Sequence, residues 1–137
     1  MAAVAGAGRS VTPPSTGGPV TVVGSRERRL PAPPSVVRRS LADPHQPGAR
    51  PWLVLRDDEV VPEVVDDGAP ARLAWRSLRP RRPDLVLAFE LRAVGAETAL
   101  RWTLTAAGEP PDARLTGHLR HRVNHLLWSD LRLSYGQ

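Results

Sequence analysis

The 137-residue sequence has no cysteine, which excludes disulfides, a thiolate nucleophile and zinc sites built on sulfur. It has no lysine, so all 19 of its basic residues are arginine, and aromatic residues make up only 4%. It also lacks any run of roughly 18 apolar residues, which excludes an integral membrane protein. What remains is a chain with one modest core, which we expect to be a soluble cytoplasmic protein.

The first 19 residues contain almost only Ala, Gly, Ser, Thr and Pro, with a single charge at Arg9. Such a segment has too little apolar mass to offset the entropy lost when a chain becomes ordered. It also lacks the basic start and the continuous apolar stretch of an export signal. We therefore expect residues 1–19 to be a disordered leader and residues 20–137 to form one domain.

The pattern of apolar residues from Val20 onward predicts strands and one short helix, followed by a meander. A β-like run covers 20–30, and Val37 and Leu41 then share one face of a short helix. Five further strands are expected, in 52–56, 59–65, 71–78, 85–92 and 100–105. Alternating apolar and polar residues in the last three favour an antiparallel sheet with one face in water.

The period changes after residue 111, where a long helix is expected. Asp112 is placed to cap its N-terminus, and Gly136 to end it. A helix over 112–134 would be about 35 Å long. Its apolar residues fall on one broad arc; they are Leu115, Leu119, Val123, Leu126, Leu127, Leu131 and Leu133.

Three stretches share a pattern with one known superfamily. The first is the opening strand with the Ala32-Pro33 dipeptide, a valine-containing helix and the end Leu41-Ala42-Asp43. The second is 97–104, where Thr98 follows a turn, and the third is the ending, 117–137. In these stretches the chain resembles the START-like polyketide cyclase and lipid-transport superfamily (SRPBCC). The resemblance implies an α+β helix-grip fold, in which a curved antiparallel sheet of about six strands wraps around a long C-terminal helix.

The same resemblance implies a function: binding of a small hydrophobic or amphipathic ligand in a cavity between the sheet and the C-terminal helix. Two alternatives stay open, an enzyme like a polyketide aromatase/cyclase and a regulatory module that binds proteins without a ligand. The superfamily has no universal catalytic motif, so the sequence leaves open whether the chain is an enzyme and identifies no catalytic residue. No cofactor is expected.

Candidate cavity residues come from the inward positions of the strands and helix. They are Trp75, Ser77, Phe89, Trp102, Leu119, Arg122, Leu126 and Asp130. The three aromatic residues either line a cavity or fill the core, because aromatic side chains dominate both. A buried carboxylate is costly, so Asp130 needs a partner, a shifted pKa or contact with water.

The opposite face of the helix is basic, and it is the candidate surface for a protein partner or a homodimer. It carries Arg114, His118, His121, Trp128 and Arg132. His121 and His125 have the spacing of metal ligands, but no carboxylate joins them, and we expect no metal. Nucleic-acid binding is not favoured either, because the sequence shows neither a stacking platform nor a known motif.

Overall fold

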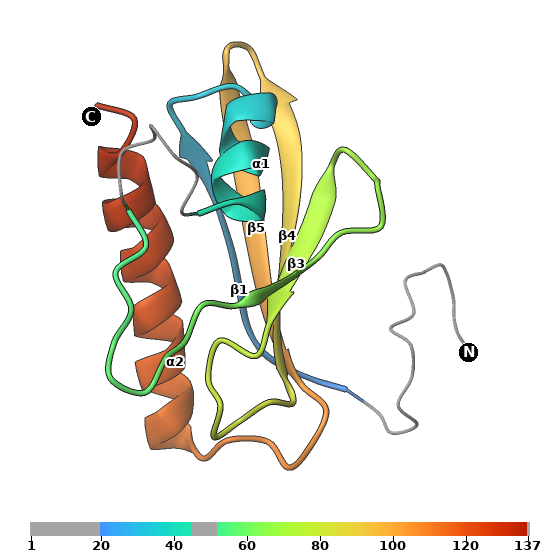
Figure 1. Ribbon diagram of the computed structural model, residues 1–137, viewed down its shortest axis with the longest axis vertical. Helices are drawn as coiled ribbons and strands as arrows, with labels where there is room; N and C mark the ends of the chain where they lie inside the picture. Colours follow the sequence, from blue (N-terminus) through green and yellow to red (C-terminus); the bar gives the residue numbers. More distant parts are fainter. Residues whose placement is uncertain (1–19, 45–51, 137) are drawn as a thin grey trace.

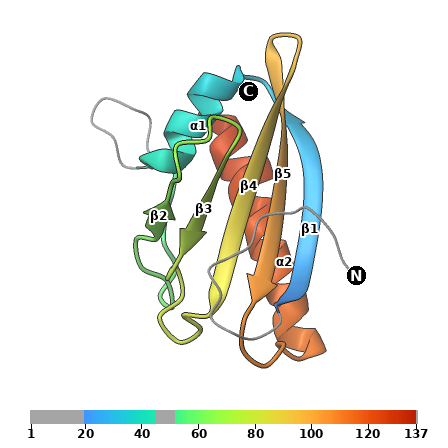
Figure 2. The same ribbon diagram turned by 90° about the vertical axis from the view of Figure 1, so that its right-hand side faces the viewer.

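One antiparallel sheet organises the protein in this computed structural model, which describes residues 20–44 and 52–136. The expected leader, 1–19, lies outside the described residues. The five strands are ordered β1-β5-β4-β3-β2 (Figures 1 and 2). They are β1 (Thr21–Leu30), β2 (Glu63–Val65), β3 (Arg72–Arg76), β4 (Leu85–Val94) and β5 (Glu97–Ala106).

The sheet has five strands and not the six expected, because the segment 52–56 forms no strand. Trp52 and Leu53 are buried in the core even so. The apolar character that suggested a strand is thus satisfied by side-chain packing alone. The next expected strand, 59–65, is reduced to the three residues of β2 at the edge of the sheet.

The alternation expected for β4 and β5 is confirmed. Phe89 lies opposite Trp102 and Leu87 opposite Leu104, and all four side chains are buried. Residues directly opposite each other in an antiparallel pair share a face, so these two strands give the sheet one apolar face. Thr98, which follows the turn, donates a buried hydrogen bond of 2.7 Å to the carbonyl oxygen of Ala32.

Two helices cover that apolar face, α1 (Pro34–Ala42) and α2 (Ala113–His125), as the two views of the ribbon show (Figures 1 and 2). Val37 and Leu41 are the buried residues of α1, as expected. The predicted cap of α2 is confirmed, because the Asp112 carboxylate accepts a hydrogen bond from the Leu115 amide at 2.8 Å. None of the helices in 20–44 and 52–136 is long and apolar enough to cross a bilayer.

The expected straight helix to residue 134 is interrupted by η2 (Leu126–Leu131), a π-helical segment that continues α2. A π-helical turn holds more residues than an α-helical one, so the positions after it rotate away from a regular helical wheel. Most of the predicted arc is buried, but Leu133 is exposed. Asp130, which the wheel placed within the arc, is half-buried.

Aromatic rings fill the centre of the core. Trp75, Trp102 and Phe89 are its largest fully buried side chains. The ring of Trp75 meets Phe89 edge-on, with centroids 5.1 Å apart, and stacks on Trp52 at 5.9 Å. The indole nitrogen of Trp75 donates to the carbonyl oxygen of Leu41 at 2.7 Å, which fixes α1 on the sheet.

Candidate functional site

A cavity of about 30 Å³ lies between the sheet and α2. Its walls are mostly apolar, and they are formed by Trp75, Leu78, Arg79, Leu85, Leu87, Leu104, Leu119, Arg122, Val123 and Leu126. A small-molecule pocket usually measures roughly 300 Å³ or more. The cavity as it stands has room for about two water molecules.

Four of the eight candidate residues line this cavity: Trp75, Leu119, Arg122 and Leu126. Phe89 and Trp102 are buried in the core instead. Ser77 follows the end of β3, where it is half-buried and has a positive φ of 65°. Asp130 lies 3.6 Å from the imidazole of His125 and does not line the cavity. The structure therefore does not bring the three polar candidates together.

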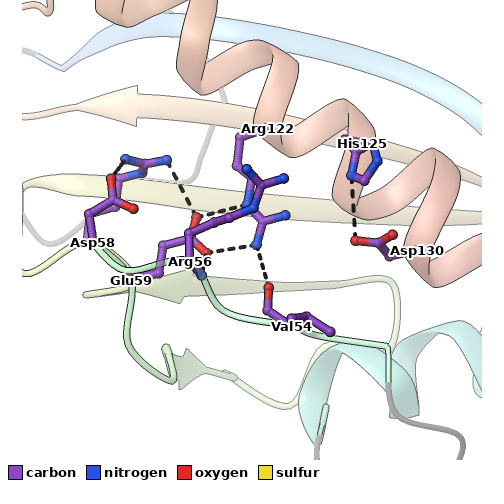
Figure 3. A network of polar contacts seen from close by, with 8 residues as sticks. Val54, Arg56, Asp58, Glu59, Arg122, His125 and Asp130 are labelled. Carbon is purple, nitrogen blue, oxygen red and sulfur yellow. Dashed lines mark hydrogen bonds and ion pairs between the residues drawn. The ribbon is translucent and has the colours of Figure 1, made fainter.

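Beside the cavity lies a buried ion pair between Arg122 of α2 and Glu59 (Figure 3). The guanidinium nitrogens Nε and Nη2 of Arg122 donate to the two carboxylate oxygens of Glu59 at 2.9 and 2.8 Å. Nη2 also donates to the carbonyl oxygen of Val54 at 2.8 Å. Two parallel bonds of this kind are the strongest arrangement that an arginine and a carboxylate can form.

Further donors surround the same carboxylate. The Arg56 amide donates to Glu59 at 2.9 Å, and Arg79 lies 3.5 Å away. Arg79 also pairs with Asp58 at 2.6 Å. Burial by itself raises the pKa of Glu59. Hydrogen bonds from Arg122 and the Arg56 amide, together with the charges of Arg122 and Arg79, outweigh burial and hold that pKa below its ordinary value. Glu59 is therefore ionised at neutral pH.

Glu59 belongs to the segment 52–62, which joins no strand. A backbone hydrogen bond links this segment to the residues after β3: the Val60 amide donates to the Leu78 carbonyl oxygen at 2.8 Å. Val54 and Val61 are exposed, whereas the buried indole nitrogen of Trp52 has no hydrogen-bond partner. This segment is thus less firmly built into the fold than the strands that form the other cavity walls.

Sequence reasoning did not identify Glu59 as a site residue. The available signal was Arg122, since an arginine at the edge of an apolar arc requires a carboxylate partner. Three consecutive acidic residues, Asp57, Asp58 and Glu59, could have supplied it. Which of them turns inward depends on the turn at 57–58 and not on any sequence period.

The candidate partner surface on the outer side of α2 is exposed in its first part and partly buried further along. Arg114, His118 and His121 are exposed, but Trp128 is half-buried. The indole nitrogen of Trp128 donates to Asn124 at 2.9 Å, and the guanidinium carbon of Arg28 lies 5.9 Å from its ring centroid. Such a distance fits a cation–π contact, so Trp128 helps to attach η2 to β1.

Arginines gather where β1 meets α2 and η2, and we call Arg26, Arg28, Arg120 and Arg132 the β1–α2 seam. Arg132 donates to the carbonyl oxygen of Arg29 at 3.2 Å, and the Arg120 side chain lies directly over Gly24. No carboxylate of the described residues forms an ion pair with these four arginines. The seam is therefore a surface of uncompensated positive charge.

The histidines of α2 do not form a metal site with other side chains. His121 and His125 stack with their ring centroids 6.4 Å apart. Within residues 20–44 and 52–136, no three His, Cys, Asp or Glu side chains are placed to hold a metal ion together.

No family model and no curated protein matches the chain. The solution structure of the Aha1 dimer from Colwellia psychrerythraea is similar to it, with 16% identity and a TM-score of 0.59 over 82% of this chain and 92% of that one. The crystal structure of CalU16 from Micromonospora echinospora is also similar, with 16% identity and a TM-score of 0.55 over 80% of this chain and 79% of that one. At this identity the likeness shows the fold alone, and it is consistent with the expected helix-grip arrangement.

Proposed function

We propose that the chain binds a small amphipathic molecule between the sheet and α2, at the cavity beside Arg122. The observation that carries this proposal is the composition of the cavity walls, whose residues are apolar except for Arg79 and Arg122. Apolar walls with a few converging polar groups are the usual form of a small-molecule site. The apolar body of the ligand would lie against Leu87, Leu104 and Leu119, and its polar end would face the arginines.

The cavity must enlarge to accept such a ligand, since about 30 Å³ is too small for one. Most of its walls belong to strands and to α2, which are fixed by regular hydrogen bonds. The segment 52–62 is the neighbouring element with the fewest such bonds, and we propose that it moves when the ligand enters. Binding is then coupled to a local opening of the fold.

The likeness to the two solved structures supports the expected fold. We propose membership of the START-like superfamily, a single domain over 20–137 preceded by a leader, and a cytoplasmic location.

The residues that line the cavity do not support the cyclase-like alternative. Ser77 and Asp130 do not line it, and Arg79 and Arg122 are already paired with carboxylates.

The test is a titration with a neutral fluorescent probe, N-phenyl-1-naphthylamine, followed by its emission. We expect saturable binding with one site per chain. Leu104→Ala should bind the probe more tightly because it enlarges the cavity, whereas Leu30→Ala, an equally buried leucine away from the cavity walls, should not. If neither the natural chain nor Leu104→Ala binds the probe saturably, the proposal is wrong.

The protein-binding alternative is favoured by one observation, the uncompensated charge of the β1–α2 seam. Like charges repel, so the seam suits an acidic partner better than a second copy of itself. The Aha1 structure is a dimer, and a homodimer of this chain would then use another surface.

A fluorescein-labelled decaglutamate peptide tests the alternative. We expect binding that weakens with salt and is lost in the triple variant Arg26→Gln, Arg28→Gln, Arg120→Gln. The control removes Arg72 and Arg76, which are paired with carboxylates, and should bind like the natural chain. Equal binding by both variants would contradict a seam-specific site.

A further inference from the structure

We infer that Arg79 and Arg122 form an anion site that Glu59 occupies in the closed state, and that the ligand is an apolar carboxylic acid whose carboxylate takes the place of Glu59. This inference rests on the proposed function and names its ligand class. It follows from three features: the shape of the site, the element that carries Glu59, and the charge left behind when Glu59 leaves.

The site has the shape of a carboxylate. Nε and Nη2 of Arg122 each hold one oxygen of Glu59, at 2.9 and 2.8 Å, and Arg79 approaches the oxygen bound by Nε at 3.5 Å. Arg79 and Arg122 are both wall residues of the apolar cavity, whereas Glu59 is not. A ligand whose apolar body lies in the cavity is therefore next to these donors, and its carboxylate can bond to them once Glu59 has withdrawn.

Parts of the element that carries Glu59 are poorly satisfied where it lies, although Trp52 and Leu53 pack in the core. Burial of Glu59 removes a charge from water, and the indole nitrogen of Trp52 on the same segment lacks a partner. Val54 and Val61 meanwhile stay in water. Moving the segment outward would return Glu59 to solvent and give the Trp52 donor access to water. These gains in hydration offset part of the free energy that opening costs, which would not be so for a core strand.

The charge left behind determines which ligand can replace Glu59. If a neutral or cationic molecule displaced it, Arg122 would remain buried without a hydrogen-bonded counter-ion. A ligand carboxylate keeps the two bonds to Arg122, so the Arg122 guanidinium itself loses only its bond to the Val54 carbonyl oxygen. The site should therefore prefer an acid over an alcohol or amine with the same hydrocarbon chain.

The experiment compares decanoate, decanol and decylamine by calorimetric titration below their micelle concentrations. For the natural chain we expect decanoate to bind at least tenfold more tightly than decanol, with decylamine weakest. Glu59→Gln removes the competing charge, and it should tighten decanoate binding about tenfold or more. The preference for decanoate over decanol should persist in this variant, because Arg122 still needs a counter-ion.

The matched control is Glu63→Gln. Glu63 is also held by an arginine through two bonds, from Arg76 at 2.9 and 3.1 Å, but this pair is exposed on the strands β2 and β3. Its loss should leave both affinities unchanged. Equal binding of decanoate and decanol, in the natural chain and in Glu59→Gln, would overturn the inference.

A second measurement needs no variant and so does not depend on Glu59→Gln folding. Hydrogen exchange of the natural chain should become faster in the segment 52–62 when decanoate saturates the protein, because the Val60–Leu78 bond opens. Unchanged or slower exchange there would contradict displacement of Glu59. If the neutral probe binds while decanoate shows no preference, the anion site is wrong and the proposed function stands; if nothing binds, both are wrong.

Discussion

Two glutamates four positions apart, Glu59 and Glu63, form nearly identical hydrogen bonds in two different environments. Glu59 is held by Arg122 at 2.9 and 2.8 Å, and Glu63 by Arg76 at 2.9 and 3.1 Å. The side chain of Glu59 is 0% exposed, and that of Glu63 is 55% exposed. The same geometry thus occurs once in the interior and once on the surface.

The difference between the two pairs lies in water and not in the bonds. On the surface, solvent and salt screen the attraction, and either partner can return to water if the other is lost. In the interior, loss of one partner leaves the other charge buried without compensation. A third pair, Asp84 with Arg82 at 2.9 Å for both bonds, is intermediate, because the Asp84 side chain is 23% exposed.

The largest effect is expected when the buried pair is broken by Arg122→Met. This variant leaves the Glu59 carboxylate buried with only the Arg56 amide and Arg79 nearby, and it also removes the donor to Val54. We expect a loss of about 3–5 kcal/mol in the free energy of unfolding. Urea denaturation followed by circular dichroism measures it, and a loss below about 1 kcal/mol would show that the interior pair behaves like a surface pair.

The double variant Glu59→Leu, Arg122→Met should recover most of that loss. Replacing both charges with apolar side chains of similar size removes the desolvation cost together with the attraction. We expect the double variant to lie within about 1 kcal/mol of the natural chain, while each single variant is far less stable. A double variant as unstable as Arg122→Met would show that the pair stabilises the fold by itself.

How much of the fold follows from the sequence depends on how local each signal is. The faces of β4 and β5 and the Asp112 cap were predicted correctly, because strand alternation and capping involve residues close in sequence. The extra strand at 52–56 was wrong, since an apolar run cannot show whether it will join a ladder or only pack its side chains. The exposure of Leu133 follows from η2, a π-helical segment that a regular 3.6-residue period does not predict.

The candidate site was predicted less completely, for a related reason. Arg122 followed from the helical wheel, but its partner Glu59 is 63 residues away in the sequence. Arg79 was not among the candidate residues. Contacts between distant segments depend on how the whole sheet and α2 pack, and a single sequence carries no periodic signal for them.

A smaller, pH-dependent effect is expected for Asp84→Asn. The hydrogen bonds from Arg82, opposed by partial burial, hold the pKa of Asp84 at about 2, below its ordinary 3.8. A lowered folded-state pKa stabilises the fold above the unfolded value, and this stabilisation is lost as pH falls from about 3.8 through about 2.

At neutral pH we therefore expect Asp84→Asn to cost about 1–2 kcal/mol. The difference between variant and natural chain should shrink as acid protonates Asp84, and urea midpoints measured from neutral pH down to about pH 2 would follow it. A difference that stays constant with pH would mean that the carboxylate charge is not what stabilises this turn.

The smallest effect is expected for Glu63→Gln, although its two bonds to Arg76 match those of the buried pair. Arg76 lowers the pKa of Glu63, yet both side chains are at least half exposed, so water replaces the lost attraction. Its urea midpoint should be indistinguishable from that of the natural chain at low and at high salt, whereas Glu59→Gln should lower the midpoint clearly at both.

A comparable loss in the two variants would mean that two-bond geometry alone determines the strength of these pairs. The buried pair would then be no more than a stronger copy of the surface one, and the exchange of Glu59 for a ligand carboxylate would lose its energetic basis, because it depends on an arginine that cannot be left unpaired.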